Sequence, residues 1–255
     1  MYRLIQKKGY DMLEGRAALV TGGSRGIGAA TALRLARDGA DVAVTYTTAA
    51  ERAETVVAEI ESLGRRGLAI RADNTGTEEV AAAVNHAAAE FGRLNILVNN
   101  AGIFPHGPLA EVTVADIDRT LAVHVRSVLL AARAAVEHMT DGGRIISIGS
   151  NLATRVPDGG TTLYSASKSA LIGLTRGLAR ELGERGITAN VVDPGSTDTD
   201  MNPADGEHAH LQRRLTALGR FNAPEDVAAA VAFLAGRDGR NITGTSILVD
   251  AGANA

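Results

Sequence analysis

The chain has 255 residues, a formal net charge of −3 at pH 7, 3% aromatic residues and no cysteine. This length fits one large α/β domain or two small ones. The missing cysteine excludes disulfides, thiol chemistry and thiolate metal sites, and it fits a reducing cytoplasm. Because there is neither a basic block nor a set of aromatic rings for base stacking, no nucleic-acid partner is expected.

The amino end, residues 1–14, is expected to be a short tail ahead of a single domain over 15–255. It holds no long apolar segment and no cleavage-like site, so a secretory signal is not predicted. An alternative start at Met12 stays open. Longer apolar stretches are broken by charged residues such as Arg126 and Arg133, which argues against a membrane-spanning helix. The sequence therefore predicts a cytoplasmic protein with no membrane partner.

From residue 16 on, segments typical of strands alternate with segments typical of helices. The expected strands are continuous apolar runs, which is typical of a parallel sheet buried on both faces. They are expected at 17–20, 41–46, 67–72, 94–98, 144–149, 186–192 and 246–250. Helices are expected up to about 38, at 49–63, 77–91 and 113–138, around 164, and at 211–218 and 224–235. This alternation predicts an α/β fold: one Rossmann-type, doubly wound parallel sheet of about seven strands with helices on both faces.

A glycine-rich turn joins the first strand to the first helix. Gly22, Gly26 and Gly28 lie in it. Glycines let the backbone approach a pyrophosphate, whose charge meets the positive end of the following helix. Because the turn stands between a strand and an amphipathic helix, it indicates a dinucleotide site.

The end of the second strand indicates which dinucleotide is preferred. A carboxylate there would bind a ribose 2′-hydroxyl, but residues 45–48 carry none, and Asp41 is at the other end of the strand. Arg25, inside the glycine turn, instead offers a cation to a 2′-phosphate, and Thr47 offers a hydroxyl. We therefore expect NADP(H) in preference to NAD(H).

A hydroxyl, a phenol and an ammonium group follow the fifth predicted strand. Ser150 closes that strand, and Tyr164 and Lys168 lie one turn apart on the next helix, about 6 Å along its axis. A cation beside a phenol favours the phenolate, so Lys168 would bring the pKa of Tyr164 down towards neutrality. Ser150 could hold a substrate oxygen. The spacing alone also fits two side chains on an exposed helix face, and the preceding motifs decide for a site.

With these motifs in this order, the chain from about Arg16 to Ala255 resembles the short-chain dehydrogenase/reductase family. The resemblance rests on Thr21-Gly22-x-x-x-Gly26-x-Gly28, Asn99-Asn100-Ala101-Gly102, Ser150, Tyr164-x-x-x-Lys168 and Asp193-Pro194-Gly195. Within the family the chain looks most like 3-oxoacyl carrier-protein reductases. The segment 197–206 also resembles a bacterial subgroup that includes a cyclic-di-GMP-binding protein linked to biofilm dispersal.

The resemblance implies a role for each matching residue. Tyr164 would be the acid/base, Ser150 would steady the carbonyl oxygen, and Lys168 would bind the nicotinamide ribose as well as tune Tyr164. The other cofactor contacts implied are Gly22, Ser24, Arg25, Ile27 and Gly28 at the phosphates and ribose, Asp73 and Asn74 at the adenine edge, Asn99, Ala101 and Gly102 at the adenosine ribose, and Pro194, Gly195, Thr197 and Thr199 at the nicotinamide. A homotetramer is implied as well.

One position departs from the family pattern. In most members an asparagine in the middle of a helix completes a tetrad and relays protons through water, and the matching residue here is His124. Imidazole donates, accepts and titrates near neutrality, so it could take part in the relay. Alternatively His124 is only a helix-face histidine and the relay is weakened or rerouted. His124 is therefore a candidate catalytic residue beside Ser150, Tyr164 and Lys168.

Two functions from different classes follow. The first is an NADPH-dependent carbonyl reductase, or alcohol dehydrogenase in reverse, acting on a small ketone or 3-oxoacyl-type substrate. The second is a nucleotide-binding regulator of the cyclic-di-GMP type with little or no reductase activity. Residues 198–210 are expected to form a mobile polar lid over the substrate. His208 and His210 lack nearby ligand partners, so no metal site is predicted.

Overall fold

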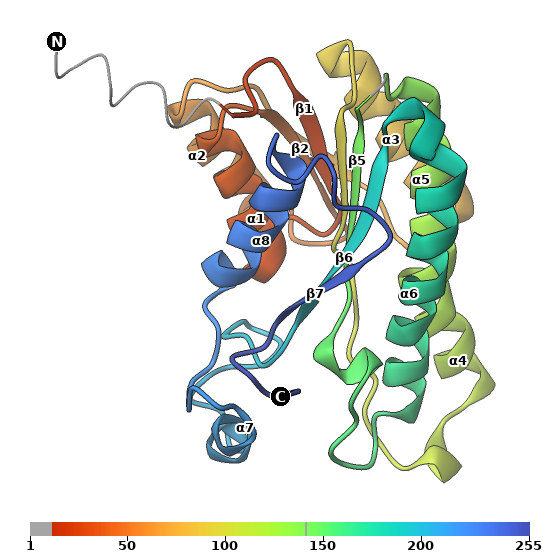
Figure 1. Cartoon of the computed structure of the whole chain (residues 1–255), viewed down its shortest axis with the longest axis vertical. Helices are drawn as coiled ribbons and strands as arrows, with labels where there is room; N and C mark the ends of the chain where they lie inside the picture. Colours follow the sequence, from red (N-terminus) through yellow and green to blue (C-terminus); the bar gives the residue numbers. More distant parts are fainter. Residues whose placement is uncertain (1–11, 141) are drawn as a thin grey trace, which may run out of the picture.

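The computed structural model of the chain describes residues 12–140 and 142–255 (Figure 1). Its centre is a seven-stranded sheet in the order β3-β2-β1-β4-β5-β6-β7, and every neighbouring pair is parallel. The strands are β1 (Ala17–Val20), β2 (Asp41–Tyr46), β3 (Gly67–Arg71), β4 (Ile96–Asn99), β5 (Arg144–Ile148), β6 (Thr188–Pro194) and β7 (Ser246–Val249). This confirms the doubly wound parallel sheet predicted from the sequence.

Helices cover both faces of the sheet (Figure 1). One face carries α1 (Gly26–Arg37), α2 (Ala50–Ser62) and α8 (Pro224–Ala235), and the other carries α3 (Thr77–Phe91), α5 (Ser127–His138) and α6 (Thr162–Leu182). The two cores share the strands: in β1, Ala18 and Val20 enter one, while Ala17 and Leu19 enter the other. Because successive side chains of a strand point to opposite faces, a strand buried on both sides must be apolar throughout.

Shorter helices lie beyond the carboxyl ends of the strands or between the larger elements. They are η3 (Leu109–Glu111), α4 (Val114–Leu121), η5 (Asn151–Ala153), η6 (Gly183–Arg185) and α7 (Ala209–Leu215). In Figure 1, α7 lies below the sheet near the carboxyl terminus of the chain. No helix in the described residues combines the length and the apolar character needed to cross a membrane.

The long helix expected over 113–138 is interrupted. A π-helical turn, Ala122–Arg126, separates α4 from α5, and the Ser127 N–H bonds to the Ala122 carbonyl, five residues back. Such turns insert one residue into an α-helix and are frequent at functional sites. His124 stands at the centre of this turn.

Part of the segment expected as a tail belongs to the folded domain. Leu13 is 1% exposed, packs in the core beside α1, and donates its N–H to the Asp38 carbonyl. The neighbouring Glu14 pairs with Arg65 at 2.7 Å. The remainder of the expected tail, residues 1–11, lies outside the described residues.

The winding of the chain reverses at β1, which pairs with β2 on one side and β4 on the other. In open parallel sheets the ligand crevice lies at the carboxyl ends of the strands at this switch point. Here those ends deliver the glycine turn after β1 and the Asn99-Asn100 pair at and after β4.

Candidate functional site

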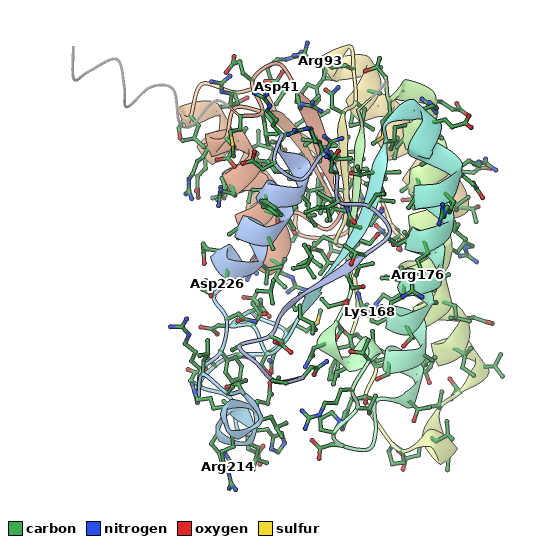
Figure 2. All side chains as sticks on the ribbon, in the orientation of Figure 1. Asp41, Arg93, Lys168, Arg176, Arg214 and Asp226 are labelled. Atoms are coloured by element: carbon green, nitrogen blue, oxygen red, sulfur yellow. The ribbon has the colours of Figure 1, made fainter. Side chains whose placement is uncertain are left out.

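A cleft of about 990 Å³ opens at the carboxyl ends of the strands. It extends from the glycine turn, past the ends of β4 and β5, to the start of α6 and the segment after β6. The predicted site residues that line it are Gly22, Ser24, Arg25, Ile27, Gly28, Thr47, Ala101, Gly102, Ser150, Tyr164, Lys168, Pro194, Gly195, Thr197 and Thr199. Motifs that are far apart in the sequence therefore meet in one place, with Lys168 between α6 and the sheet (Figure 2).

Four predicted residues do not line the cleft. The carboxylate of Asp73 accepts the Thr75 N–H at 2.8 Å and so closes its own turn, with Asn74 beside it. Asn99 is buried at the end of β4, and His124 lies behind the cleft wall. A contact of Asp73 or Asn74 with adenine stays a prediction from the resemblance.

The glycine turn is held tightly against the end of β4. The Asn100 Nδ2 donates to the Thr21 and Gly22 carbonyls at 2.9 and 3.0 Å, and the Gly22 N–H bonds to the Thr45 hydroxyl at 3.0 Å. A Cβ atom at Gly28 would lie 2.4 Å from the Gly22 carbonyl oxygen and 2.5 Å from the Asn100 Nδ2. No side chain fits there, so glycine at position 28 is what lets the turn close against the end of β4.

The start of α1 is suited to an anion. The helix has no side-chain cap and no acidic residue in its first turn. The free N–H groups and the positive end of the helix dipole therefore face the cleft, and no acidic side chain of the helix itself competes for them. Together with the glycine turn, this geometry fits the pyrophosphate of a dinucleotide.

Two arginines meet one carboxylate at the rim beside β2. The Arg25 Nη1 lies 3.5 Å from the Asp200 Oδ2, and Arg52, from the first turn of α2, donates to the same oxygen. Hydrogen bonding to Arg52 is the largest cause that lowers the pKa of Asp200. Sequence reasoning missed Arg52, because only the fold shows that the start of α2 faces the cleft.

Ser150, Tyr164 and Lys168 come together at the other end of the cleft. The Lys168 Nζ donates to the Ile148 carbonyl at 2.8 Å and lies 5.9 Å from the centre of the Tyr164 ring. The Ser150 hydroxyl accepts the Leu152 N–H at 3.2 Å, which starts a 3₁₀ turn. Phe104 packs edge-on against Tyr164 with ring centres 4.8 Å apart.

The pKa of Tyr164 moves opposite to the sequence-based expectation. Burial raises the pKa of the phenol above its usual value, and an interaction with Ser150 only partly opposes this. Burial also lowers the pKa of Lys168 to about 8, while the carboxylate of Asp193 acts in the other direction. The phenol is therefore protonated at neutral pH, which is the state a proton donor requires.

His124 is held by two hydrogen bonds on opposite sides of its ring. Its Nε2 accepts the Ile103 N–H at 3.0 Å, and its Nδ1 lies 2.8 Å from the Ser167 hydroxyl. Because that hydroxyl donates its only proton to the Tyr164 carbonyl, at 2.6 Å, Nδ1 must carry the proton towards Ser167. Both ring nitrogens are therefore used inside the protein. Burial, then the charge of Lys168, lowers the pKa of His124 to about 3.

This burial predicts a specific dependence of stability on pH. The His124 pKa is about 3 in the folded protein against a usual 6.5, so the unfolded chain binds a proton first as the pH falls. The stabilisation is complete above pH 6.5 and is lost as the pH falls towards 3. From about pH 7 to about pH 5, the wild type should lose about 2 kcal/mol more than His124→Asn.

Urea unfolding of both proteins at the two pH values measures this difference. Because other titrating groups are common to both proteins, they cancel in the comparison. Equal losses of unfolding free energy would contradict a buried neutral His124.

Comparisons with known proteins agree with this geometry. A family model described as enoyl-(acyl carrier protein) reductase matches residues 22–254. A short chain dehydrogenase/reductase of Aspergillus aculeatus, AacuN, is 41% identical over 254 residues, covering 94% of this chain and 96% of the relative. The cyclic-di-GMP-binding biofilm dispersal mediator protein of Escherichia coli K12 is 41% identical over 236 residues, covering 92% and 96%.

A solved structure is more similar still. The crystal structure of a short chain dehydrogenase from Burkholderia cenocepacia J2315, in complex with NADP, is 61% identical to this chain. It superposes with a TM-score of 0.95 and covers 96% of this chain and 100% of its own.

In the described residues of this chain, no cluster of three or more His, Cys, Asp or Glu side chains could hold a metal ion.

Proposed function

The chain belongs to the short-chain dehydrogenase/reductase family, and from that premise we propose that it is an NADP(H)-dependent reductase of ketones or 3-oxoacyl-type substrates. In the reverse direction it would act as an alcohol dehydrogenase. The observation that carries the proposal is that Ser150, Tyr164 and Lys168 line the same cleft as an anion-binding glycine turn. A proton donor is thereby placed beside a dinucleotide site.

Each of the three side chains has a separate task in this reaction. Bound NADPH would supply the hydride that reduces the carbonyl carbon. Tyr164 donates its phenolic proton to the carbonyl oxygen, so that the carbonyl becomes an alcohol and the phenol a phenolate. Ser150 holds that oxygen by a hydrogen bond, and the Lys168 ammonium stabilises the phenolate until it is protonated again. His124 holds the π turn against Ile103 and Ser167, which makes it a positioning residue rather than a proton carrier.

The preference for NADP(H) is proposed on the charges at the rim. Arg25 and Arg52 converge on one carboxylate oxygen, and a 2′-phosphate offers the same acceptor with more charge. No acidic residue follows β2 in this corner, where the cleft is lined by Thr47 and Thr48. The NADP complex of the Burkholderia cenocepacia relative supports the assignment.

Replacing Arg52 with alanine should therefore lower kcat/KM for NADPH by about 10-fold to 100-fold and leave kcat/KM for NADH within about threefold. The reason is that only NADPH has the phosphate that Arg52 would bind. Initial rates with both cofactors measure the ratio. Arg37→Ala, which removes an exposed arginine at the far end of α1, is the matched control. Equal losses with both cofactors would contradict the proposal.

Asp200→Asn should have the opposite effect. In the structure the Asp200 carboxylate pairs with both Arg25 and Arg52, so it competes with the 2′-phosphate for these two arginines. Without that negative charge, the dissociation constant for NADPH should fall several-fold at low salt, and the one for NADH should not change. Fluorescence titration measures both constants.

The polar segment that carries Asp200, residues 198–210, is the lid that we propose over the substrate.

The reaction class itself is tested by a substrate panel. NADPH oxidation is followed with β-ketoesters, 3-oxoacyl thioesters, cyclic ketones and an α,β-unsaturated acyl thioester. Turnover of the carbonyl compounds supports the proposal, and turnover of only the unsaturated thioester would replace it with an enoyl reductase. Calorimetry with cyclic-di-GMP runs in parallel, because tight binding without any turnover would favour the regulatory alternative, which the relative from Escherichia coli suggests.

We further propose that the enzyme is a homotetramer in the cytoplasm. Large apolar side chains are exposed on two separate surfaces, Val114, Leu121 and Leu129 on α4 and α5, and Phe233 and Leu248 on α8 and β7. Two such surfaces are what an assembly with two-fold axes needs. Light scattering coupled to size exclusion measures the mass of the assembly.

A further inference from the structure

A buried carboxylate lies directly behind the site and has no part in the reaction described so far. Asp193, near the end of β6, is 1% exposed. Its Oδ1 accepts the N–H of Ser150 at 2.9 Å, and Ser246 on β7 also bonds to its side chain. The carboxylate therefore reaches across from β6 to the backbone of a reacting residue.

The residue before Ser150 has to be glycine because of this carboxylate. A Cβ atom at Gly149 would lie 1.9 Å from the Asp193 Oδ1 and 2.6 Å from the Val191 Cγ1. Gly149 does not have a positive φ, so its backbone conformation is open to any residue. A side chain at this position is excluded by the Asp193 carboxylate together with the Val191 side chain, so the close approach of Asp193 to Ser150 requires glycine at position 149.

A cation also holds the same short segment. The Lys168 Nζ donates to the Ile148 carbonyl at 2.8 Å, two residues before the amide that Asp193 binds. The backbone over 148–150 is thus held at two points: the Lys168 ammonium binds the Ile148 carbonyl, and the Asp193 carboxylate binds the Ser150 N–H. Burial raises the pKa of Asp193 and lowers the pKa of Lys168, and the attraction between the two charges opposes both shifts. Tyr164 on α6 and His124 in the π turn are the other titratable groups near Lys168.

We propose that Asp193 is a positioning residue, which fixes the backbone of Ser150 and keeps the buried Lys168 protonated. A buried ammonium without a compensating negative charge tends to release its proton. A neutral Lys168 could not stabilise the phenolate of Tyr164. The catalytic consequence rests on the proposed reductase function, but the charge of Lys168 can be measured without any turnover.

The substitution Asp193→Asn separates the two roles. An amide oxygen can still accept the Ser150 N–H, whereas the negative charge is gone. If the carboxylate served only as a hydrogen-bond acceptor, this variant would resemble the wild type. If its charge matters, Lys168 should release its proton at lower pH.

The lysine content of the chain makes this measurement direct. The sequence has three lysines, at positions 7, 8 and 168. In protein labelled with ¹³C at lysine Cε, the signal that disappears in Lys168→Met belongs to Lys168, and its shift with pH gives the pKa. In Asp193→Asn that pKa should fall by about one unit or more. The alkaline limb of the kcat profile should move to lower pH by the same amount.

A buried carboxylate elsewhere provides the control. Asp38 is also buried and pairs with Arg34 on α1, so Asp38→Asn should leave the Lys168 titration unchanged. An unchanged Lys168 pKa in a folded Asp193→Asn would overturn the proposal, and so would a loss of kcat without that shift. If Asp193→Asn does not fold, the smaller Asp193→Ser tests the same loss of charge. Absence of turnover in the wild type would overturn the proposed function and leave the lysine titration as a valid test.

Discussion

Tyr164→Phe should lower kcat for ketone reduction by about 10³-fold, within the range that a positioned general acid contributes. The phenol is the proton donor of the proposed reaction, and its raised pKa keeps that proton in place at neutral pH. Phenylalanine keeps the ring that packs against Phe104 and His124, so the fold should not change.

Initial rates with NADPH and a ketone measure the loss of kcat. Fluorescence titration measures the affinity for NADPH, and thermal melting tests whether the fold is unchanged. The dissociation constant for NADPH should change by less than about threefold, because the phenol is outside the phosphate-binding region. Tyr46→Phe is the matched control, since Tyr46 lines the cleft at the end of β2, and two strands separate β2 from β5, which leads to Ser150. Unchanged turnover in Tyr164→Phe would exclude the proposed mechanism.

The sheet could be predicted because burial leaves a direct trace in the sequence. A strand that is covered on both faces has no polar alternation, and β1 with its two sets of buried side chains shows this. The π turn left no such trace. His124 in this turn bonds to Ile103 and Ser167, and such contacts between distant residues do not alter the local apolar pattern.

The same distinction applies to the site. Ser150, Tyr164 and Lys168 were found because their spacing is local or their motif is distinctive. Arg52 was missed, and Asp193 was noted only as part of a motif without a role, because the contacts of both depend on which elements become neighbours in the fold. The pKa of Tyr164 was predicted in the wrong direction for a related reason: charge can be read from the sequence, but the burial that dominates here cannot.

Gly28→Ala should weaken NADPH binding by about 30-fold or more and lower the melting temperature. The added methyl group would lie 2.4 Å from the Gly22 carbonyl oxygen and 2.5 Å from the Asn100 Nδ2. Relief of these contacts has to separate the glycine turn from the end of β4 and break the bonds that Asn100 makes there. Overpacking of this kind costs about 1–3 kcal/mol, and 2 kcal/mol corresponds to about 30-fold in affinity.

The control distinguishes this clash from a general effect of adding a methyl group. Gly183 follows α6 with a φ of −59°, and its Cβ would meet no atom within 4 Å. Gly183→Ala should therefore leave NADPH binding unchanged and keep or slightly raise the melting temperature, because alanine restricts the unfolded chain. Calorimetric titration and thermal melting measure both variants. Wild-type affinity in Gly28→Ala would mean that the dinucleotide does not need the closed turn, and the assignment of its pyrophosphate to the start of α1 would fail.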